Sequence, residues 1–173
     1  MTIFRGSFKL NGPHLLISES WYTCGRLVMA DDHLVSCLDS RANPYNFLQL
    51  KPGEAIVIRN VGGRVKSSLT DILALDTQFG LNKIIVVQHS NCGSSHLKEG
   101  DVREHVKTKT EDSANAEAWE KAVMGYVSTP SEQCIKDDLA LLQQQPHIRK
   151  ELAESAVGMW LDVETGLLKE VKQ

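Results

Sequence analysis

Three short apolar runs in the first half of the chain alternate with segments of different periodicity. The runs are His33–Cys37, Ala55–Arg59 and Lys83–Val87, and β-branched residues dominate the second and third. Apolar residues at consecutive positions are typical of strands in a parallel sheet that is buried on both faces. Between the second and third runs, leucine and isoleucine recur at helical spacing over Ser67–Phe79, and Gly80 supplies a helix stop. The pattern predicts a strand–helix–strand crossover.

The rest of the chain predicts further helices and a closing hairpin. Leu15, Trp21 and neighbouring apolar residues favour an N-terminal helix from His14 to about Met29. Polar helices are expected at Asp101 to about Lys109, Ala114 to about Tyr126, and Ser131 to about Gln144. Two apolar runs at Ala156–Val163 and Leu167–Val171 flank Glu164-Thr165-Gly166, which indicates a strand, a turn and a strand. We therefore expect an α/β fold.

Composition narrows the class of protein without identifying it. A chain of 173 residues with 42% apolar and 24% charged residues, and with no linker or repeat, is expected to form a single domain spanning 1–173. The 19 basic residues against 22 acidic ones form no basic stripe, so we expect no nucleic acid partner. No stretch approaches the roughly 18 apolar residues of a membrane span, and the start lacks an apolar signal core. We expect no membrane partner and a cytoplasmic location.

Two of the predicted strands end in residues that bind metals. Cys37-Leu38-Asp39-Ser40-Arg41 closes the first strand, and His89-Ser90-Asn91-Cys92-Gly93 follows the third. The carboxyl ends of parallel strands meet at one edge of a sheet, where open α/β folds place their ligands. If the backbone stays extended after Cys37, alternation places Cys37, Asp39 and Arg41 on one side. A thiolate, a carboxylate and a guanidinium would then share a pocket.

This set of residues predicts a catalytic zinc ion bound by Cys37, His89 and Cys92. Thiolate and imidazole are the ligands that Zn²⁺ prefers, and three of them leave a fourth position open for catalysis. Two thiolates cancel the charge of the ion, so its water should be less acidic than at an all-histidine site, which favours mildly alkaline pH. Asp39 either binds the metal itself or is held away from it by two parallel hydrogen bonds from Arg41. If Asp39 filled the fourth position, the site would be closed, as in a non-catalytic zinc-containing interaction or sensor domain.

Other candidate residues have simpler interpretations. Cys24 and Cys134 are expected to be structural thiols, because a lone buried cysteine usually acts as a small apolar residue. His96 follows the metal motif closely, where a histidine can shuttle protons. Gly62-Gly63 lacks the rest of a phosphate-loop signature and is better explained as a tight turn that permits close backbone approach.

These motifs resemble those of the β-class carbonic anhydrases. The match comprises Cys37-Leu38-Asp39-Ser40-Arg41, the segment from Gly53 to Gly63, and His89-Ser90-Asn91-Cys92-Gly93, in the family's order. It covers about residues 15 to 98, and Asp162 to Leu168 is similar to the family's closing hairpin. The short chain looks most like the small microbial subclass.

The resemblance implies a specific fold, site and activity. The fold would be a mainly parallel β-sheet with an antiparallel edge strand, flanked by helices, with the N-terminal helix embracing a dimer partner. The site would hold Zn²⁺ through Cys37, His89 and Cys92, with Asp39 and Arg41 as catalytic residues that gate it. The activity would be addition of hydroxide to carbon dioxide, giving bicarbonate, in a homodimer or dimer of dimers.

Two positions depart from the subclass and open an alternative substrate. Asn91 stands where Asp is common inside the His-to-Cys motif, and Ser94 stands where a Met usually follows the Cys-Gly pair. The same scaffold also hosts hydrolases of carbonyl sulfide and carbon disulfide, which are linear and electrophilic at carbon. Carbonyl sulfide hydrolysis to carbon dioxide and hydrogen sulfide is therefore the alternative. The expected substrate pocket consists of Asn91, Gly93, Ser94, Gly62 and Gly63.

Overall fold

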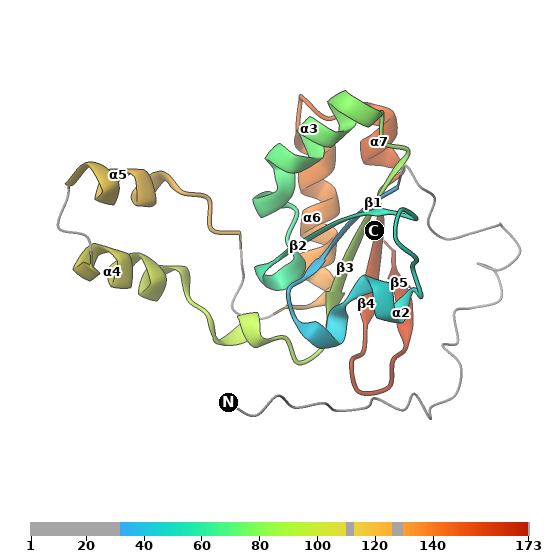
Figure 1. Ribbon diagram of the computed structural model, residues 1–173, viewed down its shortest axis with the longest axis horizontal. Coiled ribbons are helices and arrows are strands. Elements are labelled where there is room, and N and C mark those ends of the chain that lie inside the picture. Colours follow the sequence, from blue (N-terminus) through green and yellow to red (C-terminus); the bar gives the residue numbers. More distant parts are fainter. Residues whose placement is uncertain (1–31, 110–112, 126–129, 173) are drawn as a thin grey trace, which may run out of the picture.

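Three stretches of the chain are described by a computed structural model, which Figure 1 shows as a ribbon. They cover residues 32–109, 113–125 and 130–172. The helix expected from His14 to about Met29, and Cys24 within it, lie outside the described residues.

A five-stranded sheet forms the centre of the fold. Its strands lie in the order β2-β1-β3-β4-β5, with bounds β1 Asp32–Cys37, β2 Ile56–Asn60, β3 Lys83–His89, β4 Val157–Leu161 and β5 Leu168–Val171. Strands β2, β1, β3 and β4 are parallel to one another, and β5 runs antiparallel to β4. The predicted α/β fold and its mainly parallel sheet with an antiparallel edge strand are confirmed.

Strand β1 lies between β2 and β3, although β2 separates β1 from β3 in the sequence. The register pairs Cys37 with Asn60 on one side, and Ser36 with Val87 on the other. The chain leaves β1 towards one edge of the sheet and returns on the other side through helix α3, so the β1–β3 boundary is a topological switch point. Ligands of open α/β sheets bind at such points, outside the carboxyl ends of the strands.

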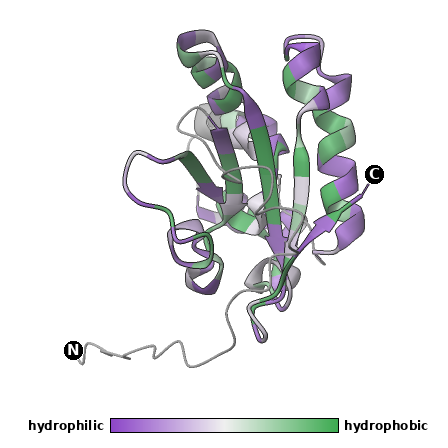
Figure 2. Ribbon diagram, turned by 90° about the vertical axis from the view of Figure 1, so that its right-hand side faces the viewer, coloured by the Kyte–Doolittle hydropathy of each residue, from purple (hydrophilic) through white to green (hydrophobic). Residues whose placement is uncertain are grey.

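Helices cover the sheet on both faces, and each face has its own apolar core. On one face lie α3 (Leu69–Phe79), α6 (Glu132–Gln144) and α7 (Lys150–Glu154), packed through residues such as Ile72, Leu139 and Leu152. The other face carries α2 (Pro44–Phe47), whose Phe47 packs with apolar residues of the strands. Figure 2 shows apolar residues concentrated along the strands, whereas the helices mix apolar and polar residues.

Helices α4 (Glu99–Lys109) and α5 (Ser113–Lys121) form a hairpin that extends away from the sheet in Figure 1. The sequence predicted that the second of these would continue to about Tyr126, which is wrong over Ala122–Gly125. The reason is Arg103, whose guanidinium binds the carbonyl oxygens of Trp119, Glu120 and Ala122 and so caps the helix. Within the described part of the chain, no helix has the length and apolarity needed to cross a membrane.

Several short elements carry no periodic signal and were not predicted. They are α2, α7 and the 3₁₀ turns at Ser40–Ala42 and Gly93–His96. Two other 3₁₀ turns, Val61–Gly63 and Lys66–Ser68, coincide with the predicted Gly62-Gly63 turn and with the start of the helix predicted over Ser67–Phe79. A helix of four or five residues is too short to show a 3.6-residue pattern. Three of the turns, at Ser40–Ala42, Val61–Gly63 and Gly93–His96, follow strand ends or the Cys92 position, so they shape the site described below.

The buried histidine of β1 generates a prediction about acid stability. His33 is fully buried, and its ring nitrogens have no hydrogen-bond partner among the described residues. Burial lowers the pKa of His33 to about 4 from its ordinary value of 6.5, although the charge of Asp71 opposes the shift. Because the unfolded chain takes up the proton first, stability is lost as the pH falls from 6.5 to about 4, by up to about 3 kcal/mol.

His33→Leu should therefore reduce the loss of unfolding free energy between about pH 7 and about pH 4.5, by about 2 kcal/mol. Chemical denaturation of both proteins at the two pH values measures this difference. His147→Gln, at an exposed position, should leave the pH dependence unchanged. Identical pH dependence in the His33→Leu and parent proteins would refute the assignment.

Candidate metal centre

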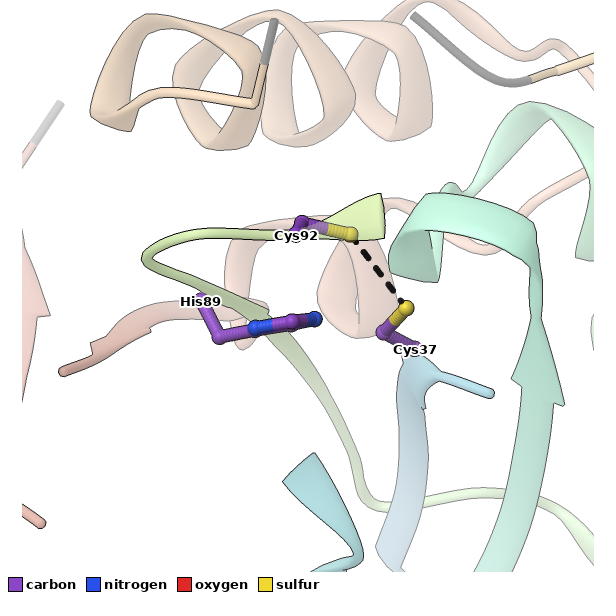
Figure 3. Close-up of side chains that lie close together, drawn as sticks. All are labelled: Cys37, His89 and Cys92. Carbon is purple, nitrogen blue, oxygen red and sulfur yellow. Dashed lines mark hydrogen bonds between the residues drawn. The ribbon is translucent and has the colours of Figure 1, made fainter. Parts of the chain in front are cut away.

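Cys37, His89 and Cys92 come together at the switch point of the sheet. Cys37 ends β1, His89 ends β3, and Cys92 follows in the next turn. Their ligand atoms all lie within 4.8 Å of one another, and Figure 3 shows the three side chains pointing towards a common centre. All three residues are buried, with exposed fractions of 4%, 1% and 3%. This is the only group of its kind found in the described residues.

The ring of His89 is oriented for metal binding. Nδ1 lies 2.9 Å from the Ser90 carbonyl oxygen, which can only accept, so Nδ1 carries the proton. Nε2 is buried and has no hydrogen-bond partner among the described residues. Burial lowers the pKa of His89, which keeps the imidazole neutral. A neutral ring with its free lone pair directed at two sulfur atoms is the form that binds a metal ion.

The two thiols complete a donor set that fits zinc. Cys37 Sγ and Cys92 Sγ lie 3.6 Å apart, and the Asp39 N–H donates to Cys37 Sγ at 3.4 Å. Burial raises the pKa of Cys37; the Asp39 N–H lowers it, and the charge of nearby Cys92 raises it further. Two buried thiolates so close repel each other, so a cation is what would stabilise them together. Two sulfur ligands and one imidazole nitrogen match catalytic sites that keep a fourth position open.

Asp39 and Arg41 form a bidentate ion pair beside this centre. Arg41 Nε donates to Oδ1 at 3.0 Å and Nη2 donates to Oδ2 at 2.7 Å. The Arg41 guanidinium lowers the pKa of Asp39 to about 2. The extended backbone expected after Cys37 is wrong beyond Asp39, because Asp39 instead caps a 3₁₀ turn at Ser40–Ala42. That turn lets Arg41 fold back onto Asp39, so the predicted pairing is reached by a different route.

Arg59 is a residue of the site that sequence reasoning missed. It lies near the end of β2, and its Nε donates to the Cys37 carbonyl at 3.0 Å while Nη2 donates to the Asp39 carbonyl at 2.8 Å. Arg41 makes a similar link, because its Nη2 also donates to the Asn91 carbonyl at 2.8 Å. A signal was available for Arg59, since the predicted strand Ala55–Arg59 ends at the same sheet edge as the other two.

Gly62 and Gly63 form a tight turn against the end of β1, as the sequence predicted. Their φ angles are 78° and 64°, which favour glycine. A Cβ on Gly63 would lie 2.8 Å from the Val87 carbonyl oxygen and 2.9 Å from the Cys37 backbone nitrogen. The Gly62 N–H donates to Cys37. The turn therefore supports the first ligand from close range.

The other residues of the expected pocket lie around Cys92. Ser94 is buried, with its Oγ 3.1 Å from Cys92 Sγ, and a Cβ on Gly62 would lie 3.3 Å from that Oγ. Asn91 is exposed and has a left-handed backbone with φ of 49°. Gly93 is exposed. Gly62, Ser94 and Cys92 thus adjoin one another, whereas Asn91 and Gly93 lie at the surface.

Two further residues from the sequence lie apart from the ligand group. His96 is exposed at the end of the 3₁₀ turn that follows Cys92. Cys134 is buried on α6, beside Ser131 Oγ at 3.4 Å. Cys134 does not join the three candidate ligands, which agrees with its interpretation as a structural thiol.

Comparison with known proteins links most of the chain to one family. A family model described as carbonic anhydrase matches residues 33–168. Beta-carbonic anhydrase 1 of Mycobacterium tuberculosis (strain ATCC 25618 / H37Rv) is 29% identical over 141 residues, which are 80% of each chain. The matched stretch contains all three candidate ligands together with Asp39, Arg41 and Arg59.

Two further similarities concern a different substrate and the fold. A carbon disulfide hydrolase of Saccharolobus solfataricus is 30% identical over 77 residues, which are 44% of this chain and 38% of the hydrolase. The solved structure of a carbonic anhydrase from Glaciozyma antarctica superposes with a TM-score of 0.71 and 25% identity. That superposition covers 89% of this chain and 93% of the other.

Proposed function

The chain belongs to the β-class carbonic anhydrase family of zinc enzymes, and from this premise we propose that it hydrates carbon dioxide to bicarbonate. The observation that carries the proposal is the convergence of Cys37, His89 and Cys92 beside a carboxylate that Arg41 holds. The reaction combines one carbon dioxide with one water and yields bicarbonate and a proton.

Cys37, His89 and Cys92 are the residues that would hold zinc. When bound, the ion supplies the positive charge that makes water a stronger acid and so provides hydroxide at moderate pH. Because two thiolates offset that charge, we expect the activity to favour mildly alkaline pH. The Ser90 carbonyl fixes the tautomer of the neutral His89 ring, so that Nε2 is the nitrogen presented to the metal.

Asp39 would orient the attacking water. Its pKa of about 2 keeps the carboxylate ionised at any pH at which the enzyme works. Three donors of Arg41, namely the backbone N–H, Nε and Nη2, occupy most of the lone pairs of the Asp39 carboxylate. A carboxylate has about four such positions, so one remains to accept a hydrogen bond from water. The ion pair also supports an open fourth position on the metal, against a closed, non-catalytic site.

The proposed substrate pocket consists of Gly62, Gly63, Ser94, Asn91 and Gly93. The two buried glycines let their turn pack closely at the end of β1, against the Cys37 backbone at Gly63 and against Ser94 at Gly62. Ser94 contributes a hydroxyl group next to Cys92.

Carbonyl sulfide is the second candidate substrate, with carbon dioxide and hydrogen sulfide as the products. Ser94 favours it, because the hydroxyl lies 3.1 Å from a ligand sulfur in place of the larger side chain that the resemblance led us to expect. The 30% identity over 77 residues to a carbon disulfide hydrolase also supports a sulfur-containing substrate. Specificity of this kind depends on pocket shape rather than on the fold.

We also propose that residues 1–173 form one domain and that the protein assembles as a homodimer or a dimer of dimers. Leu38 and Tyr45 support a partner, because both are exposed, at 56% and 40%, on the segment that follows Cys37. Apolar side chains at such positions are common in protein interfaces.

The zinc-loaded protein is expected to accelerate carbon dioxide hydration in stopped-flow assays at about pH 8. His89→Ala should lower the rate on the order of a hundredfold or more, since it removes a ligand. The matched control is His147→Ala, at an exposed position between α6 and α7, which should keep at least about half of the activity. A zinc-loaded protein with no rate above that of buffer would rule out the proposal.

Carbonyl sulfide is assayed on the same preparation, by loss of the gas from the headspace and release of sulfide. If carbon dioxide is the main substrate, its hydration should be much faster than the hydrolysis of carbonyl sulfide. Faster sulfide release would reverse the order of the two candidates, and its absence would exclude the second.

Arg41→Ala should abolish most of the turnover, by about a hundredfold, while zinc content stays the same. Loss of the guanidinium frees the Asp39 carboxylate, an oxygen donor that can itself bind zinc and fill the open position. Activity and zinc content measured on one preparation test this. Arg149→Ala is the control, because Arg149 is about as exposed as Arg41 (47% against 42%) and holds Asp76 in the same two-pronged way. Unchanged turnover in Arg41→Ala would refute the gate.

A further inference from the structure

A buried ion pair lies next to two of the segments that carry the candidate ligands. Arg64 Nε and Nη2 donate to the two carboxylate oxygens of Asp138 at 2.8 and 3.0 Å. Asp138 is on α6 and is 1% exposed, and Arg64 follows the Gly62–Gly63 turn and is 8% exposed. Gln88, in β3, donates to the same carboxylate at 3.0 Å. We call Asp138, Arg64 and Gln88 the Asp138 network.

The Asp138 network is expected to contribute little to the free energy of folding. Burial of Asp138 raises its pKa despite the nearby Arg64 charge, so the carboxylate is not fully compensated. Arg64 Nη1 and Gln88 Oε1 are buried and have no hydrogen-bond partner among the described residues. A buried ion pair with unpaired polar atoms is often no more stable than apolar residues of the same size. The network therefore calls for an explanation other than stability.

One arm of the network reaches Cys37. Arg64 is two residues from Gly62, whose N–H donates to the Cys37 thiol, and a Cβ on Gly62 would lie 3.6 Å from Arg64 Cγ. Asn60 binds the backbone of Arg64 at both its N–H and its carbonyl, at 2.7 and 2.8 Å. The Arg64 side chain fixes the other end of this turn on Asp138. The turn that supports Cys37 is thus attached to α6.

The other arm reaches His89. Gln88 directly precedes His89 in β3, and its side chain is fully buried and bound to Asp138. Neighbouring residues of a strand point to opposite faces, so Gln88 holds the strand from the face opposite to His89. Through Arg64 and Gln88, the Asp138 carboxylate is thereby connected to the segments around Cys37 and His89. These two candidate ligands are 52 positions apart in the sequence (89 minus 37).

We infer that Asp138 is a positioning residue for the metal centre, acting through Arg64 on the Cys37 turn and through Gln88 on His89. The inference rests on the proposed zinc site of Cys37, His89 and Cys92. It predicts that loss of the network weakens zinc binding while the fold persists. Partners behind the ligands that fix their orientation commonly change metal affinity by about 10- to 100-fold.

The test compares zinc affinity in variants of the zinc-loaded protein, by competition with a chromophoric chelator at about pH 7.5. Arg64→Met combined with Asp138→Leu replaces the ion pair by apolar side chains and leaves no buried charge. We expect this double variant to stay folded by circular dichroism and to bind zinc about 10- to 100-fold more weakly. Gln88→Met removes one arm without touching a charge and should weaken zinc binding at least about threefold.

The control is Arg149→Met combined with Asp76→Leu, which removes a similar ion pair between the end of α3 and Arg149, the N-cap of α7. It should lower the melting temperature, because Asp76 also accepts from the Leu81 N–H, and leave zinc affinity unchanged. Zinc affinity within about twofold of the parent in Gln88→Met would overturn the inference, even if the double variant failed to fold. An equal loss of affinity in the control would also overturn it. Because the readout is zinc affinity, a protein that binds zinc without hydrating carbon dioxide would contradict the proposed function alone.

Discussion

The parallel pairing of β1 with β3 is the constraint on which the site depends. The two strands are separated in sequence by β2 and α3, and their pairing places Ser36 opposite Val87, just before Cys37 and close to His89. Each strand ends in a buried ligand atom, and the turn after β3 adds Cys92 within the same 4.8 Å. Because β1 also pairs with β2, Asn60 and Arg59 reach this edge as well. The donor set is therefore a property of strand order, which is why residues far apart in sequence can hold one ion.

Short-range backbone contacts then refine the positions that the sheet sets. Gly63 fits against the Cys37 backbone only because it lacks a Cβ, and a Cβ on Gly62 would lie against Ser94. Arg59 ties the Cys37 and Asp39 carbonyls to β2, and Arg41 ties Asp39 to the Asn91 carbonyl. Arg41 and Arg59 thus each join a ligand-bearing segment to another part of the chain, and Arg64 joins the turn beside Cys37 to α6. A site held from several sides keeps its geometry before a metal or substrate arrives, which is what catalysis at a metal requires.

The parts that could be predicted from sequence are those with a periodic or paired signal. Short apolar runs predicted all five strands to within two residues at each end, and strand ends bearing Cys37, His89 and Cys92 predicted the ligand group. The Asp39–Arg41 contact was also predicted, but through an extended backbone that the structure replaces by a 3₁₀ turn. Turns of three residues leave no pattern. The Asp138 network could not be predicted, because it joins residues of three elements whose proximity follows only from the packing of α6 on the sheet.

The central claim is that Cys37, His89 and Cys92 hold one zinc ion and leave one position open. X-ray absorption at the zinc edge of the purified protein tests it most directly, because Zn–S and Zn–N or Zn–O distances differ by about 0.2 to 0.3 Å. The account predicts two sulfur ligands, one imidazole nitrogen and one light atom that is exchangeable with solvent or inhibitor. A shell with one or no sulfur ligand, or a zinc content far below one per chain in protein purified without chelators, would contradict it.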